Sequence, residues 1–154
     1  MADTTATPAT MKVKLKIKRF DPADSGGKTW WQEYEVDVHP DSTVLDSLIE
    51  VREQEDGTLA MRCACRASIC GSCGMKVNGS AKLVCKTRVI DVAPNGEQLI
   101  VEPMGNQHVV RDLVVSLDTF FNQINRVEPF LQPSFVPEQG EDTASNESME
   151  NLLT

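Results

Sequence analysis

The feature that most constrains this chain is a cysteine-rich stretch between residues 62 and 88. All five cysteines of the 154-residue sequence lie within it. Four of them, Cys65, Cys70, Cys73 and Cys85, are spaced C-x4-C-x2-C-x11-C. The first three match the plant-type pattern that holds a [2Fe–2S] cluster. The spacing therefore predicts a [2Fe–2S] cluster as cofactor, with these four cysteines as its ligands.

The residues between the cysteines suit a tight loop. A two-iron cluster needs four thiolates close together, so the neighbouring ligands must come from one short segment. Glycine and other small side chains allow the backbone to wrap closely and to turn its N–H groups toward the cluster; the sequence supplies Ser68, Gly71, Ser72 and Gly74. Asn78-Gly79 is a strong hairpin-turn signal, and we expect this hairpin to deliver Cys85.

Charge supports the same assignment. The stretch contains no acid, whereas the whole chain has a net charge of −8. A positive setting favours an anionic tetrathiolate cluster and tends to raise its reduction potential. The acidic balance argues against nucleic-acid binding and favours protein partners. The six bases of this stretch are Arg62, Arg66, Lys76, Lys82, Lys86 and Arg88.

Other uses of the cysteines fit less well. Zinc sites are usually built from two C-x2-C-like pairs, whereas here three cysteines share one loop. Disulfides require an oxidising compartment, and the sequence shows no secretory segment. The fifth cysteine, Cys63, would give a poorer C-x6-C spacing and is interpreted as a partly buried free thiol. The two histidines, His39 and His108, lie outside the cysteine spacing, so a Rieske centre is not needed.

Hydrophobic periodicity predicts the scaffold. Residues 12–18 alternate strictly between apolar and polar, and alternation resumes over 30–38 after a run of turn residues, which indicates an antiparallel hairpin. A helix follows, with Asp41 or Ser42 as N-cap and Gly57 as its stop. A closing strand is expected over 98–102. This order is typical of an α+β, β-grasp ferredoxin-like domain with one packed helix.

The remaining segments complete the predicted organisation. Residues 1–10 form a disordered leader, and 11–105 form the β-grasp [2Fe–2S] domain. Leu113, Leu117, Phe120, Phe121 and Ile124 occur at helical spacing, so a second amphipathic helix is expected over 112–127, within a helical extension over 106–132. Acidic residues without periodicity indicate a disordered tail over 133–154, a truncated linker to a domain the chain lacks. No segment is apolar over the length needed to span a bilayer, so direct membrane insertion is not expected.

These residues resemble the iron–sulfur subunit of succinate dehydrogenase and fumarate reductase, in its N-terminal [2Fe–2S] domain. The resemblance runs from about Met11 to Leu131. It is carried by CRASICGSCGM from Cys65, by the eleven-residue gap to Cys85, and by VRDLV from Val110. Where the family commonly has Glu-Gly, this chain has Ala-Ser at positions 67 and 68. The lost negative charge is expected to raise the cluster potential.

The resemblance implies an electron-transfer role. A partner flavoprotein would oxidise succinate, and the [2Fe–2S] cluster would receive electrons singly from its FAD. The chain would be an oxidoreductase subunit of the tricarboxylic acid cycle or of fumarate reduction, with no substrate site of its own. Family members continue into a second domain with further clusters, through which membrane anchor subunits bind. Such a complex would lie at the inner, cytoplasmic face of the membrane. The alternative is a free, soluble ferredoxin-like carrier.

Overall fold

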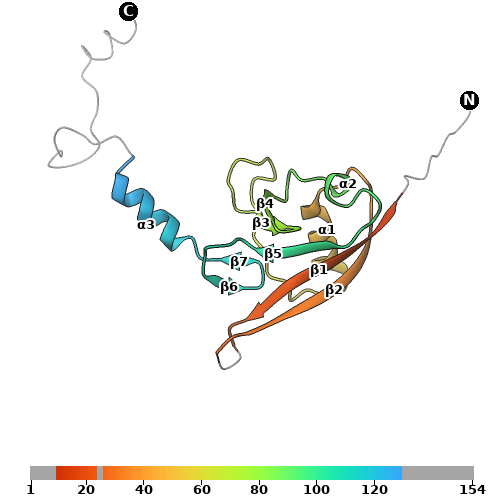
Figure 1. Cartoon of the computed structure of the whole chain (residues 1–154), viewed down its shortest axis with the longest axis horizontal. Coiled ribbons are helices and arrows are strands. Elements are labelled where there is room, and N and C mark those ends of the chain that lie inside the picture. The colour runs from red at the N-terminus through yellow and green to blue at the C-terminus, as the bar shows by residue number, and fades with distance from the viewer. Residues whose placement is uncertain (1–9, 24–25, 130–154) are drawn as a thin grey trace, which may run out of the picture. The chain divides into compact units, whose positions relative to one another are not determined.

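The computed structural model describes residues 10–23 and 26–129. Its centre is a five-stranded mixed sheet with the strand order β2-β1-β5-β3-β4 (Figure 1). The β1–β2 hairpin pairs in one unbroken antiparallel register from Met11 opposite Val38 to Asp21 opposite Lys28. β5 lies parallel to β1 and antiparallel to β3. The strands are β1 Met11–Asp21, β2 Lys28–Val38, β3 Gly74–Val77, β4 Ser80–Leu83 and β5 Leu99–Pro103.

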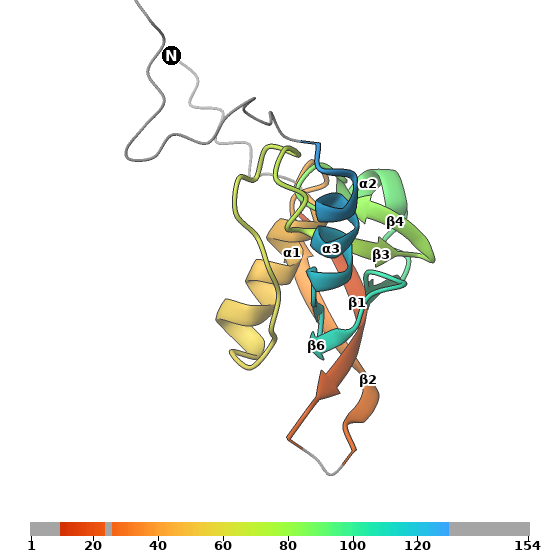
Figure 2. The same ribbon diagram turned by 90° about the vertical axis from the view of Figure 1, so that its left-hand side faces the viewer.

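One helix packs on one face of this sheet (Figure 2). α1 spans Val44–Glu50 and continues as a π-helix, η1, over Val51–Glu55. The predicted N-cap at Asp41 or Ser42 is wrong, because Thr43 occupies that position. The Thr43 hydroxyl accepts a hydrogen bond from the Asp46 backbone N–H, and the Asp46 carboxylate accepts one from the Thr43 N–H. This reciprocal capping box satisfies two groups at the helix start.

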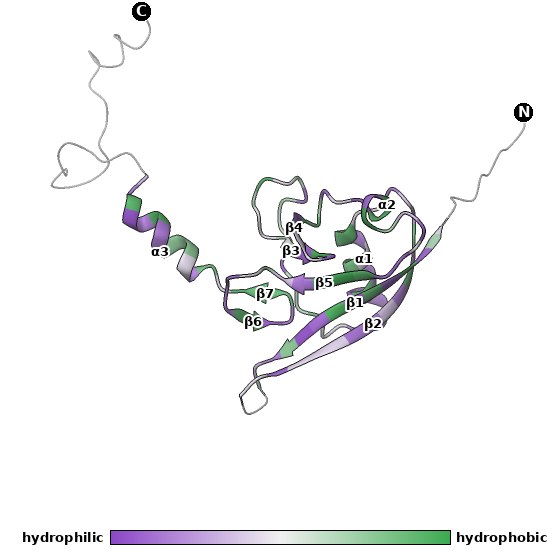
Figure 3. Cartoon of the chain, in the orientation of Figure 1, coloured by the Kyte–Doolittle hydropathy of each residue, from purple (hydrophilic) through white to green (hydrophobic). Residues whose placement is uncertain are grey.

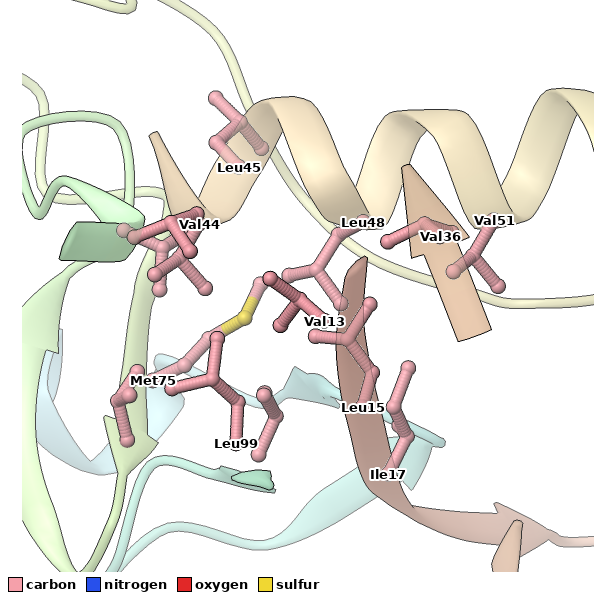
Figure 4. Packing of buried hydrophobic residues seen from close by; sticks show 14 of the residues in the cluster. Val13, Leu15, Ile17, Val36, Val44, Leu45, Leu48, Val51, Met75 and Leu99 are labelled. Carbon is pink, nitrogen blue, oxygen red and sulfur yellow. The ribbon is translucent and has the colours of Figure 1, made fainter. Parts of the chain in front are cut away.

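The core lies between α1 and the sheet. Val13, Leu15 and Ile17 of β1 are completely buried, as the alternation of that strand predicts. Figure 4 shows Leu48 of α1 and Val51 of η1 beside these strand residues. The bands of opposite hydropathy along β1 in Figure 3 are the same alternation. Burial of each such aliphatic side chain stabilises the fold by about 1.5–3 kcal/mol.

The opposite face of the β1–β2 hairpin is charged. Lys12 pairs with Glu35 at 3.3 Å and Lys16 pairs with Glu33 at 3.5 Å, so the charges of the two strands are complementary. The ammonium groups of Lys16 and Lys18 each lie 5.8 Å from the ring centre of Trp31. Exposed pairs of this kind contribute little to stability, roughly 0–1 kcal/mol each.

The segment after β5 differs from the prediction. The helix expected over 112–127 begins only at Asp118, and α3 spans Asp118–Val127. The residues before it form a small two-stranded sheet of β6 (Val109–Arg111) and β7 (Val114–Val115). Leu113, placed by its spacing on a helix face, belongs to the main core and is 3% exposed. A short helix that the sequence did not indicate, α2, covers Val89–Val92.

The chain divides into two units that meet between Thr119 and Phe120, inside α3. The first unit confirms the predicted α+β, β-grasp fold class. In the second, α3 exposes both aromatic side chains, and the rings of Phe120 and Phe121 meet edge to face. The leader predicted for residues 1–10 lies almost wholly outside the described residues, and the tail predicted for 133–154 lies entirely outside them. Among the described residues, no helix has the length and apolar character needed to cross a membrane.

Candidate metal centre

The cysteine loop, residues 59–73, connects the end of the helical layer to β3 without regular secondary structure. Its backbone turns sharply at three positions of left-handed conformation: Arg66 (φ 54°), Ser68 (φ 61°) and Gly71 (φ 72°). Only glycine adopts such angles freely, so the two non-glycine residues are held there by the rest of the loop. Two of the small residues predicted for this loop, Ser68 and Gly71, occupy these positions, and the larger Arg66 occupies the third.

These turns direct backbone N–H groups at one sulfur. Three amides donate to Sγ of Cys65: those of Ala67 at 3.3 Å, Ile69 at 3.4 Å and Cys70 at 3.4 Å. Hydrogen bonds from amides to a thiolate stabilise its negative charge and are a feature of the surroundings of iron–sulfur clusters. The loop thus supplies hydrogen-bond donors to Cys65, which an anionic cluster bound there would accept.

Cys85 reaches the loop through the predicted hairpin. The turn between β3 and β4 consists of Asn78 (φ 49°) and Gly79 (φ 79°), the left-handed pair that a two-residue hairpin turn demands. After β4, the Val84 N–H donates to the Cys73 carbonyl at 3.3 Å, which places Cys85 next to the loop. Its Sγ lies 3.9 Å from the Ser68 hydroxyl.

The four predicted ligands interact as two pairs, Cys65 with Cys70 and Cys73 with Cys85. A hydrogen bond with the Ser72 side chain, helped by Cys65, lowers the pKa of the Cys70 thiol to about 6. Burial raises the pKa of Cys73. For Cys85 burial acts in the same direction, but hydrogen bonds with Cys73 and Ser68 outweigh it, and its pKa lies below the ordinary value.

The pairwise arrangement fits a two-iron centre, in which each iron takes two cysteine thiolates. Among residues 10–23 and 26–129, no three histidine, cysteine or acidic side chains converge so as to hold one metal ion. The fit to a [2Fe–2S] cluster rests on the donor set, which is four thiols in two pairs with amide and hydroxyl donors around them.

The site lies at the surface on one side and against the core on the other. Cys65 and Cys70 are exposed, whereas Cys73 and Cys85 are buried. Ile69, at the tip of the loop, is 84% exposed, the largest value among the described large hydrophobic residues. Cys63 is partly buried and packs against the core, as predicted for a free thiol.

Two of the six basic residues in the stretch 62–88 have acceptor groups from outside it. Arg88 forms ion pairs with Asp91 at 2.9 Å and Asp41 at 3.5 Å, so acids from outside the stretch partly neutralise it. The guanidinium of Arg62 donates to the Val115 carbonyl at 3.0 Å. Both histidines are exposed; His39 lies near Asp41, and His108 lines a surface hollow of about 350 Å³ next to Pro103.

The fold and the loop together define a ferredoxin-like iron–sulfur domain. The family described as 2Fe-2S iron-sulfur cluster binding domain matches residues 14–122, and the chain belongs to this family. Its cofactor is accordingly a [2Fe–2S] cluster, as the cysteine spacing predicted.

The chain is similar to chains of several solved structures. A chain of the Mycobacterium smegmatis Sdh1 complex in the apo form is 31% identical, with a TM-score of 0.71 over 90% of this chain. This match confirms the predicted resemblance to the iron–sulfur subunit, and this chain covers 56% of that chain's length. A hypothetical protein from Helicobacter pylori is 18% identical with a TM-score of 0.48, covering 74% of this chain and 22% of that one, and adds nothing to the assignment.

Proposed function

We propose that Cys65, Cys70, Cys73 and Cys85 hold the [2Fe–2S] cluster, and that the chain relays single electrons from the FAD of a partner flavoprotein. The observation that carries the proposal is a loop in which three backbone amides donate to Cys65 Sγ, with Cys85 Sγ 3.9 Å from the Ser68 hydroxyl of the same loop. When bound, such a cluster supplies one-electron redox chemistry at a potential set by its surroundings. The role of the chain itself is to hold these four ligands in position.

The two pairs of cysteines differ in solvent exposure, so a partner can approach the proposed cluster from one side only. Cys65 and Cys70 lie at the exposed tip of the loop beside Ile69, where a partner can approach closely. Cys73 and Cys85 lie against the core, which fixes their positions. We assign the exposed side to electron entry from the flavoprotein.

The wider setting follows from the similarity to a chain of the Sdh1 complex. On this proposal, the chain is an electron-transfer part of a succinate dehydrogenase or fumarate reductase. The partner flavoprotein oxidises succinate, or reduces fumarate, and links the chain to the tricarboxylic acid cycle. Association with the cytoplasmic face of a membrane would come through anchor subunits bound to other parts of the complex.

The ligand assignment is tested by changing each cysteine to serine. The full chain is purified without oxygen, and its iron and sulfide contents are measured with its visible spectrum. Each of the four ligand variants should lose most of its iron. Cys63→Ser is the matched control and should keep the wild-type content. Loss of iron in Cys63→Ser, with iron retained in Cys65→Ser, would show that the first ligand is Cys63 and that the proposed ligand set is wrong.

The electron-transfer role is tested by paramagnetic resonance with a potentiometric titration. A rhombic signal that appears on reduction, well above the roughly −400 mV of plant-type ferredoxins, together with co-purification of a flavoprotein, is expected. A plant-type potential in a chain that purifies alone would favour the free carrier instead. A colourless, zinc-loaded chain would contradict both.

A further inference from the structure

A buried arginine joins β1 to two distant segments. The Arg19 side chain is 3% exposed, and its guanidinium binds the Asp112 carboxylate in a two-pronged arrangement, through Nε at 2.8 Å and Nη2 at 3.3 Å. Charged side chains are almost never this buried unless paired. Nη2 also donates to Thr58 Oγ1 at 2.9 Å. The two N–H groups of Nη1 are shared among three acceptors, Gln32 Oε1 at 3.0 Å, Tyr34 Oη at 2.7 Å and Asp56 Oδ2 at 2.6 Å.

Asp112 is the most buried acid of this network, with 1% exposure. Besides the two bonds from Arg19, its carboxylate accepts the Phe20 N–H at 3.1 Å and the Ala60 N–H at 2.9 Å. Its backbone is in the left-handed region with φ 46°, which is uncommon for a residue other than glycine. A single side chain therefore ties β1 to Ala60, the second residue of the cysteine loop.

Further bonds join the same two segments. The Leu113 N–H donates to the Ala60 carbonyl at 3.2 Å, and the Arg62 guanidinium reaches the Val115 carbonyl. Residues 58–62, which we call the loop entrance, are thus bonded to residues 112–115 at Ala60 and Arg62. Cys65 follows only five residues after Ala60, and no helix or strand lies between them.

We propose that Asp112, oriented by Arg19, is a positioning residue for the cluster, because it fixes the path of the loop entrance toward Cys65. This inference rests on the ligand set proposed above. A buried ion pair is by itself weak evidence for stability, since apolar residues often replace one without loss. An apolar residue, however, has no acceptor for the Ala60 amide. The directional bonds of Asp112 therefore specify where the loop begins.

The test compares Asp112→Asn with Val36→Ala in the full chain as purified. Asparagine keeps the size of aspartate but has one acceptor oxygen, so Arg19 loses one of its two bonds together with either the Ala60 or the Phe20 N–H bond. Val36→Ala disturbs the core from β2 and removes none of these bonds. Hydrogen exchange of residues 58–66 should rise about tenfold or more in Asp112→Asn relative to exchange in β3, and not in Val36→Ala. The cluster's resonance g-values and visible circular dichroism should shift only in Asp112→Asn.

Equal exchange and unchanged spectra in the two variants would overturn the proposal and leave Asp112 a purely structural residue. If Asp112→Asn does not fold, Arg62→Ala tests the same entrance from its exposed side and should also speed exchange at residues 58–66. Exchange is measurable whether or not iron is present. Absence of iron from the wild type would therefore count against the ligand set, whereas normal iron with unchanged exchange would count against Asp112 alone.

Discussion

The cysteine loop and the β1–β2 hairpin keep their shapes by different interactions. The hairpin has a continuous hydrogen-bonded register and buries its apolar face completely at Val13, Leu15 and Ile17. The loop has no such register, and its tip, Ile69, is in solvent. It depends instead on amides bonded to Cys65 and on the bonds that hold its entrance to residues 112–115. Burial thus builds the scaffold, whereas directed polar bonds shape the site.

The largest expected effect concerns the buried cation that joins the two regions. Arg19→Met keeps the volume but leaves the carboxylates of Asp56 and Asp112 without their cation, which should lower the free energy of unfolding by about 3–5 kcal/mol. Lys12→Met, on the same strand, removes a cation that is 71% exposed and should cost about 1 kcal/mol or less. Urea unfolding of both variants measures the difference. Equal losses would show that the network adds no more than a surface pair.

A second contrast uses apolar side chains. Leu48→Ala in α1 empties a completely buried position and should cost about 2–5 kcal/mol in unfolding free energy. Ile69→Ala at the loop tip should change it by no more than about 0.5 kcal/mol, because this side chain is already in water. Thermal or urea unfolding tests the pair. A loss of more than about 1 kcal/mol in Ile69→Ala would mean that the tip packs against the protein.

The two regions also differ in how far their residues could be predicted. The alternation in residues 12–18 encodes structure locally, so the hairpin and the fold class could be predicted from the sequence. The cysteine spacing is equally local and gives the proposed ligand set. The same alternation places Arg19 on the buried face after Ile17, and an arginine there signals a buried acid. Its partner lies 93 residues away, in a segment whose apolar spacing imitates a helix. Only tertiary contacts identify Asp112.

Lowering the pH should weaken the hydrogen-bond network around Arg19, because Asp56 is one of its carboxylates. Hydrogen bonds from Thr58, then from Tyr34 and Arg19, hold the pKa of Asp56 well below its ordinary value of 3.8. A carboxylate with a lowered pKa in the folded state adds stability above that ordinary value, and the contribution is lost as the pH falls below it. Asp56→Asn should therefore be about 2 kcal/mol less stable than wild type at pH 6, and the gap should narrow toward pH 2.

The measurement is urea unfolding of wild type and Asp56→Asn across this pH range. Glu35→Gln, which removes the acid of an exposed pair, is the matched control and should show a gap of about 1 kcal/mol or less throughout. A gap for Asp56→Asn that stays constant from pH 6 to pH 2 would contradict the assignment of the stabilising charge to Asp56.

The smallest expected effect decides where the helix of the scaffold begins. The sequence predicted Asp41 or Ser42 as the cap, whereas the structure has Thr43, whose hydroxyl accepts the Asp46 N–H at 3.2 Å. Thr43→Ala should cost about 1 kcal/mol in unfolding free energy. Ser42→Ala is the control next to it and should cost a few tenths of a kilocalorie at most, because Ser42 is bonded through its backbone to His39 and Val89. A larger loss in Ser42→Ala than in Thr43→Ala would move the cap back to the position expected from the sequence.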